Sequence, residues 1–129
     1  MKPRFISDIH LSENNSHLTN AFKRFLNESK ESCSHLFILG DLFEAWIGDD
    51  DNNAYHQEIK ELLIEFTRNG PETFFIHGNR DFLIGQDFAT EVGISLLPDP
   101  YTVDINGLKV ILSHGDFLCT DDLDYINFR

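Results

Sequence analysis

The stretch "FFIHGNRDF", Phe74 to Phe82, passes from three apolar residues through a His and a Gly into Asn79, Arg80 and Asp81. Short apolar runs that end at turn residues are typical of strands buried on both faces of a sheet. The change to an amide, a guanidinium and a carboxylate then falls where the strand ends. We therefore interpret this stretch as a buried strand that leads into a loop of chemically active side chains.

Three further segments repeat this design: "RFISDIH" from Arg4, "HLFILGDLFE" from His35 and "KVILSHGD" from Lys109. Helical spacing of apolar residues separates them, and a short helix is expected at Gln86–Val92 before Gly93. The helix faces expected to meet the core are Leu18, Ala21, Phe22, Phe25 and Leu26, then Tyr55, Ile59, Leu62, Leu63 and Phe66. Asn106-Gly107 favours a two-residue type I′ hairpin. The sequence thus predicts an α/β fold, βαβαβα plus a β-hairpin.

The length of 129 residues suits one domain with a packed core, and 22 acidic against 10 basic residues give a formal charge of −12. Such acidity repels a phosphate backbone, so nucleic acid is not an expected partner. It could reflect solubility or carboxylates gathered around metal ions. The two cysteines form no C-x-x-C pattern, no apolar leader follows the N-terminus, and no apolar run approaches the ~20 residues of a membrane span. We expect a cytoplasmic protein with at most peripheral membrane contact.

Polar residues gather where the four expected strands end, and ligands of open α/β sheets bind at the carboxyl ends of strands. The clusters contain Asp8, His10, Asp41, Glu44, His77, Asn79, Arg80, Asp81, His114 and Asp116. Carboxylate, amide and imidazole donors without a Cys cluster suit a catalytic Mn²⁺, Fe²⁺ or Zn²⁺ centre better than a structural zinc site. Singly, Asp8 fits a turn residue and His10 a surface histidine equally well. Glu44, His77 and Asp116 fit either supporting or packing roles, and Asp49–Asp51 is interpreted as a solvated loop.

Taken in order, four motifs resemble those of the calcineurin-like metallophosphoesterases. They are D-x-H (Asp8–His10), G-D-x-x-E (Gly40–Glu44), G-N-R-D (Gly78–Asp81) and H-G-D (His114–Asp116). The resemblance implies a layered α/β sandwich with two metal ions, both Mn²⁺. It further implies that Asp8 and His10 bind the first ion, that Asp41 bridges both, and that Asn79 and His114 bind the second.

Arg80 stands where this family usually has a histidine that can act as a general acid. A phosphate leaves without a general acid, and a guanidinium can neutralise its growing charge, so Arg80 favours a pyrophosphate substrate. With "GDLFEAWIGDD", "FFIHGNRDFLIG" and "HGDFLCTDD", the chain is similar to the family branch that hydrolyses UDP-2,3-diacylglucosamine in lipid A biosynthesis. That branch yields UMP and 2,3-diacylglucosamine 1-phosphate.

The resemblance assigns roles to individual residues. Water would attack the α-phosphorus, with Asn79 and Arg80 as catalytic residues that contact the substrate phosphates, and Asp122 would bind the substrate head group. The acyl chains would lie against Trp46, Phe82, Tyr125 and Phe128, although plain packing is an alternative for each aromatic ring. Peripheral contact with the cytoplasmic face of the inner membrane follows. A nucleotide pyrophosphatase, a phosphomonoesterase and a non-catalytic remnant remain alternative functions.

The family's C-terminal G-H-x-H motif does not occur before Arg129. We therefore expect residues 1–129 to be the N-terminal portion of a single metallophosphoesterase domain, with residues 117–129 beginning a helical cap. Each metal ion would lack one histidine, so this portion alone should have little activity.

Overall fold

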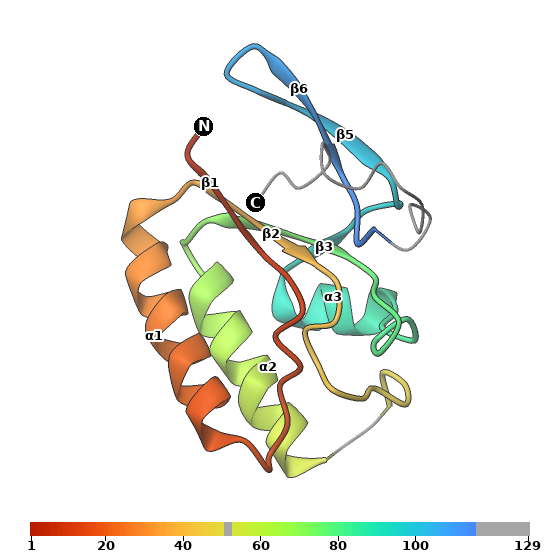
Figure 1. Cartoon of the computed structure of the whole chain (residues 1–129). Helices are drawn as coiled ribbons and strands as arrows, with labels where there is room; N and C mark the ends of the chain where they lie inside the picture. The colour runs from red at the N-terminus through yellow and green to blue at the C-terminus, as the bar shows by residue number, and fades with distance from the viewer. Residues whose placement is uncertain (51–52, 116–129) are drawn as a thin grey trace.

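A four-stranded parallel sheet is the centre of the computed structural model, which describes residues 1–50 and 53–115 (Figure 1). Its strands lie in the order β1 (Pro3–Ile6), β2 (His35–Leu39), β3 (Glu72–Ile76) and β4 (Ser95–Leu96). The first three confirm the expected strand positions. The sequence did not predict β4, because two residues are too short to show a periodic pattern.

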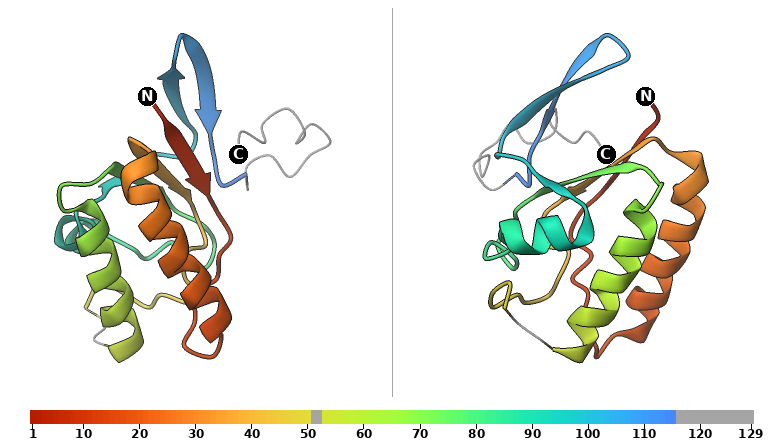
Figure 2. Two further views of the ribbon diagram at one scale, coloured as in Figure 1. Left: turned by 90° about the vertical axis from the view of Figure 1, so that its left-hand side faces the viewer. Right: turned by 180° about the vertical axis from the view of Figure 1, so that it is seen from behind.

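The helices α1 (Ser16–Ser32), α2 (Ala54–Thr67) and α3 (Gln86–Val92) pack on one face of this sheet (Figures 1 and 2). Alternate residues of β2 point to opposite faces, so Leu36 and Ile38 join the helix-side core, whereas Phe37 and Leu39 face away. The helix α3 begins and ends where the sequence predicted, with Gly93 in the left-handed conformation at its end (φ 80°).

The buried face of α1 differs from the expected one. Ala21 is exposed, while Thr19 and Ser29 are buried beside Phe22 and Leu26. Burial of Thr19 is tolerated because its hydroxyl is hydrogen-bonded to the Tyr55 hydroxyl of α2 at 2.6 Å. Apolar periodicity alone therefore placed one edge of this helix face wrongly.

The hairpin consists of β5 (Tyr101–Ile105) and β6 (Leu108–Leu112), which form a separate antiparallel sheet. Asn106 (φ 54°) and Gly107 (φ 90°) make the two-residue turn with both residues at positive φ, confirming the type I′ prediction. The expectation of a fully buried strand is wrong for β6, of which only Leu112 is buried. Within the described residues β6 pairs with β5 alone, and it covers the main sheet with one face. The strand β1 is likewise only half-buried throughout.

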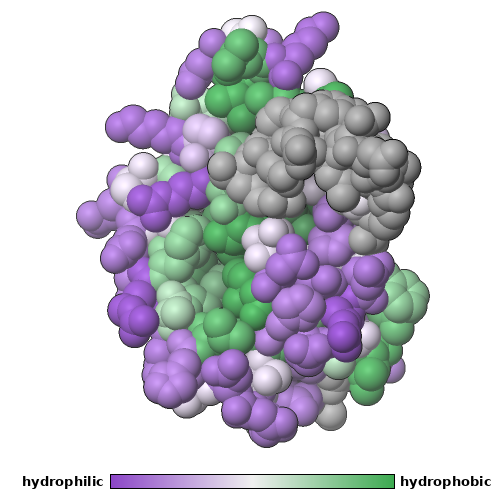
Figure 3. All heavy atoms as spheres, viewed as in Figure 1, coloured by the Kyte–Doolittle hydropathy of each residue, from purple (hydrophilic) through white to green (hydrophobic). Residues whose placement is uncertain are grey.

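Large apolar side chains are exposed in two regions, at the hairpin and on the loops that follow β2 and β3 (Figure 3). On the loops these residues are Ile47, Phe82 and Leu83. Among the described helices, none combines the length and apolar character needed to cross a membrane.

Candidate metal centre

The loops that follow β1 and β2 run side by side and continue the pairing of their strands. The Asp8 amide donates to the Gly40 carbonyl and the His10 amide donates to the Asp41 carbonyl, each at 3.0 Å. A chain separation of about thirty residues is thus closed by backbone hydrogen bonds, as expected for two adjacent parallel strands. This pairing brings Asp8, His10 and Asp41 together at the carboxyl end of the sheet.

These same three residues have a left-handed backbone conformation, with φ of 56° at Asp8, 54° at His10 and 53° at Asp41. Among the described non-glycine residues, positive φ is otherwise found only at Asn69 and Asn106. Such conformations cost roughly 1–3 kcal/mol each and cluster at functional sites. The fold therefore concentrates backbone strain at three of the five residues predicted to bind metal.

The side chains of the three residues converge. The Nε2 atom of His10 lies 3.9 Å from Oδ1 of Asp8 and 3.8 Å from Oδ2 of Asp41. One ligand atom from each residue lies within 4.8 Å of the other two. The carboxylates of Asp8 and Asp41 repel each other at this spacing unless a positive charge lies near them, and a cation bound by both carboxylates and by the ring nitrogen would supply it. The group has the dimensions and donor types of a divalent-cation site.

His114 reaches the same place from the loop after β6. Its Nδ1 atom is 2.8 Å from the Leu39 carbonyl, and because a carbonyl oxygen can only accept, Nδ1 carries the proton of this hydrogen bond. In the neutral ring, Nε2 then presents a lone pair to Oδ2 of Asp41 at 3.3 Å, with both side chains buried. In that tautomer both Nε2 of His114 and Oδ2 of Asp41 are electron-pair donors with no proton between them, which is the arrangement expected of two ligands of one cation. The donors Asp8, His10, Asp41 and His114 together suit Mn²⁺, Fe²⁺ or Zn²⁺.

Two glycines make this close approach possible. A Cβ atom on Gly78 would collide with the amide nitrogen and Oδ1 of Asp41, and one on Gly40 would lie 2.5 Å from Nδ1 of His114. Gly40 also has a φ of 89°, which favours glycine. The glycines of the G-D and G-N motifs are therefore required by the space around Asp41 and His114.

Asp81 is fully buried and organises the loops around the site. Its carboxylate accepts four backbone hydrogen bonds, from the amides of Asp41, Leu42, Phe43 and Gly78. A buried carboxylate is stable only when its acceptors are satisfied in this way. The sequence placed Asp81 in the polar cluster without assigning this structural role.

Arg80 lies at the rim of the centre. Its amide donates to Oδ1 of Asp41 at 2.8 Å, while its guanidinium is 58% exposed and lies 3.1 Å from Oε1 of Glu44. Asn79 precedes it on the same loop and is also exposed. His77 is half-buried, and its Nε2 donates to the Ile84 carbonyl at 2.5 Å, which gives it a packing role.

Trp46 does not line a surface groove, contrary to its expected contact with acyl chains. It is 3% exposed and packs against Phe43, His56 and Phe88 in the helix-side core. Because the indole is enclosed by these rings, we exclude it from the substrate-binding residues. Asp122, Tyr125, Phe128 and the expected cap segment 117–129 lie outside the described residues.

Asp49 is not part of a solvated acidic loop, contrary to expectation. Its carboxylate accepts hydrogen bonds from the amides of Gly85 and Phe88 and from Nε1 of Trp46. Burial raises the pKa of this carboxyl, but the hydrogen bonds, aided by the charge of Lys60, outweigh burial and hold the pKa below its usual range. Asp49 thus joins the loop after β2 to the start of α3.

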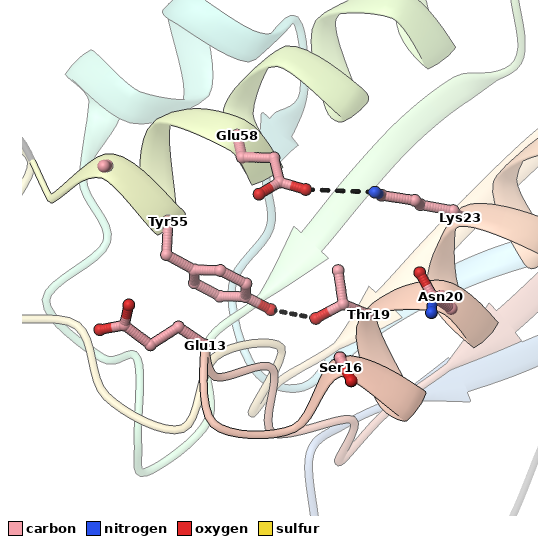
Figure 4. A pocket seen from close by; sticks show the side chains of 8 residues that line it. Glu13, Ser16, Thr19, Asn20, Lys23, Tyr55 and Glu58 are labelled. Atoms are coloured by element: carbon pink, nitrogen blue, oxygen red, sulfur yellow. Dashed lines mark hydrogen bonds and ion pairs between the residues drawn. The ribbon is translucent and has the colours of Figure 1, made fainter.

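A polar groove of about 420 Å³ lies elsewhere, between α1 and α2 (Figure 4). Its side chains interact with one another: Tyr55 with Thr19 at 2.6 Å, and Lys23 with Glu58 at 3.2 Å. The described lining of this groove includes none of the residues expected to bind metal. Metal binding and catalysis are therefore expected at the strand ends and not in this groove.

The whole chain, residues 1–129, matches the model of the calcineurin-like phosphoesterase family. The chain belongs to this family. This phosphoesterase chain is 47% identical over 128 residues to the UDP-2,3-diacylglucosamine hydrolase of Histophilus somni (strain 2336), covering 99% of the chain and 55% of that relative. It is 50% identical over 125 residues to the UDP-2,3-diacylglucosamine hydrolase of Photorhabdus laumondii, covering 97% and 52%. The phosphoesterase chain therefore spans about half the length of the curated relatives it matches.

Two solved structures share the fold of this phosphoesterase chain. Pseudomonas putida nuclease MPE matches with a TM-score of 0.56 at 18% identity, over 79% of the chain and 49% of the nuclease. A protein of unknown function from Aquifex aeolicus matches with a TM-score of 0.54 at 20% identity, over 87% of the chain and 59% of that protein. At these identities the likeness concerns the fold alone.

Proposed function

We propose that the complete protein containing this chain hydrolyses the pyrophosphate bond of UDP-2,3-diacylglucosamine, giving UMP and 2,3-diacylglucosamine 1-phosphate in lipid A biosynthesis. The observation that carries the proposal is the convergence of Asp8, His10, Asp41 and His114 on one centre with the Arg80 guanidinium beside it. It is supported by 46–50% identity to hydrolases named for this substrate.

The metal-binding roles proposed for the individual side chains are those that the family resemblance implies, and the convergence of Asp8, His10, Asp41 and His114 supports them. In this proposal Asp8 and His10 would hold one divalent ion, Asp41 would contribute to both sites, and His114 and Asn79 would hold the other. Mn²⁺ is the proposed metal, and the same donors also suit iron or zinc. Bound there, the cations would lower the pKa of a water molecule and neutralise charge on the phosphoryl group.

Arg80 and Asn79 orient the substrate phosphates in this proposal. The Arg80 backbone is held by Asp41 while its guanidinium remains exposed, so free N–H donors can bind phosphate oxygens. A positive charge beside the departing phosphate stabilises the transition state, and no general acid is needed because a phosphate is a good leaving group. This arrangement favours a pyrophosphate over a phosphomonoester of an alcohol.

The apolar part of the substrate is proposed to lie beyond Arg80. Phe82 is 66% exposed and Leu83 is 48% exposed on the same loop. Burial of acyl chains against such side chains is worth ~0.8 kcal/mol per CH₂ group. We propose that Tyr125 and Phe128 extend this surface, that Asp122 binds the substrate head group, and that the protein contacts the cytoplasmic face of the inner membrane peripherally.

The test is Mn²⁺-dependent release of UMP by the complete protein from UDP-2,3-diacylglucosamine and from unacylated UDP-glucosamine. The acylated substrate should be preferred, and Asp41→Asn should lower its turnover about 100-fold or more, since a metal centre contributes several kcal/mol to the reaction. Glu61→Gln, on the exposed side of α2, is the matched control and should keep wild-type turnover. Preference for the unacylated substrate would instead favour a nucleotide pyrophosphatase, and full activity of Asp41→Asn would contradict the proposed centre.

A further inference from the structure

Glu44 lies between two functional side chains and has no role in the function proposed above. Its Oε2 atom is 3.6 Å from Nδ1 of His10, and its Oε1 atom is 3.1 Å from Nη1 of Arg80. We propose that Glu44 is a positioning residue that uses one carboxylate to orient His10 toward the metal and Arg80 toward the substrate phosphate. The part of this inference that concerns Arg80 and the substrate phosphate rests on the proposed function, whereas the part that concerns His10 does not.

The backbone fixes Glu44 opposite His10. The Glu44 amide donates to the Leu11 carbonyl at 2.9 Å, and Leu11 and Phe43 form a parallel bridge between the two loops. Both of these neighbours are fully buried. The Cα of Glu44 is therefore held in place by packed residues, and only the side chain has freedom to move.

His10 has its two ring nitrogens in different surroundings. Nε2 faces the carboxylates of Asp8 and Asp41, whereas Nδ1 faces Glu44. A neutral imidazole that binds a cation through Nε2 must carry its proton on Nδ1, and an acceptor beside Nδ1 favours that tautomer and fixes the ring. At 3.6 Å the contact is longer than a hydrogen bond, and a small rotation of the half-exposed Glu44 side chain would bring the two atoms within hydrogen-bond distance.

Arg80 is held at both ends. Its amide is bonded to Asp41, and one edge of its guanidinium meets Glu44, which leaves the remaining N–H donors for a phosphate. Because both side chains are about half exposed, this ion pair adds little to stability. Its effect is to reduce the number of conformations of a long side chain that must be ordered when substrate binds.

The first experiment measures Mn²⁺ affinity of the complete protein by isothermal titration calorimetry. Glu44→Gln keeps the size of the side chain, and we expect 10–100-fold weaker binding, the usual effect of removing a partner of a metal-binding histidine. Glu13→Gln is the matched control, since Glu13 lies on the same loop as His10 but faces the groove between α1 and α2 (Figure 4), and it should bind as the wild type does. Unchanged Mn²⁺ affinity in Glu44→Gln would overturn the proposal.

The second experiment is a double-mutant cycle of Glu44→Gln and Arg80→Ala, read as affinity for inorganic phosphate at saturating Mn²⁺. Glu44→Gln should weaken phosphate binding several-fold when Arg80 is present and leave it unchanged in Arg80→Ala. Additive effects would overturn the proposal. Neither experiment uses the lipid substrate, so a failure of the proposed function, no UMP release by the wild type, is distinguishable from a failure of this inference.

A control experiment compares the melting temperatures of the metal-free wild type and Glu44→Gln in EDTA. The two temperatures should be equal, because Glu44 is half exposed and its substitution should not affect folding. If Glu44→Gln melts lower than the wild type, Glu44→Asp takes its place in both experiments. Asp keeps the charge on a side chain one CH₂ shorter, which cannot reach His10 and Arg80 together, so the same losses are expected.

Discussion

The two carboxylate oxygens of Asp41 have different partners. Oδ1 accepts the amide of Arg80 at 2.8 Å, and Oδ2 faces the imidazoles of His10 and His114. Asp41 itself is held at positive φ by the surrounding hydrogen bonds, and Gly78 packs directly against it. The position of this one side chain therefore depends on a neighbour that has no side chain of its own.

Gly78→Ala should disrupt the centre. The new methyl group would collide with the amide and Oδ1 of Asp41, so the free energy of unfolding should fall by about 1–3 kcal/mol and Mn²⁺ affinity should fall with it. Urea denaturation and calorimetry measure the two quantities. Gly107→Ala is the control, because Gly107 has open space around it at the hairpin turn, and that variant should lose stability but keep its metal affinity. Wild-type Mn²⁺ affinity in Gly78→Ala would show that Asp41 is not placed by this contact.

At the scale of elements, α3 is capped by a residue distant in the sequence. Its first turn has no side-chain cap from Gly85, and Asp49 supplies acceptors to the amides of Gly85 and Phe88 instead. Local sequence patterns predicted the bounds of α3 correctly but could not reveal this cap. They also could not reveal the burial of Trp46, because both features depend on how the loop after β2 packs against α3.

Asp49→Asn should lower the free energy of unfolding by about 1–2 kcal/mol at pH 7, since hydrogen bonds to a charged acceptor are lost. The pKa of Asp49 is lower in the folded protein than in the unfolded chain, where it is about 3.9. The folded state thus binds fewer protons, so the stabilisation is present above pH 4 and is lost as the pH falls through the folded pKa. Urea denaturation at pH 7 and pH 3 should show the difference between wild type and variant shrinking at the lower pH. A difference that stays constant or grows would contradict this assignment.

At the scale of the molecule, the site is formed by two sheets. The parallel sheet supplies Asp8, His10 and Asp41, and the separate hairpin supplies His114. The sequence predicted the place of these four residues because each lies within a few positions of a strand end: Asp8 and His10 after β1, Asp41 after β2 and His114 after β6. It did not predict that β6 would leave the main sheet, because the pairing of strands is decided by tertiary contacts that periodicity does not record.

The most direct test of the shared centre is anomalous X-ray diffraction from crystals of the complete protein containing Mn²⁺. We expect anomalous peaks at the carboxyl ends of β1 and β2, with Asp8, His10, Asp41 and His114 at coordination distances of about 2.2 Å. Asp41 should be a ligand common to the Asp8/His10 side and the His114 side. Peaks elsewhere, or a bound ion that Asp41 does not contact, would contradict the account.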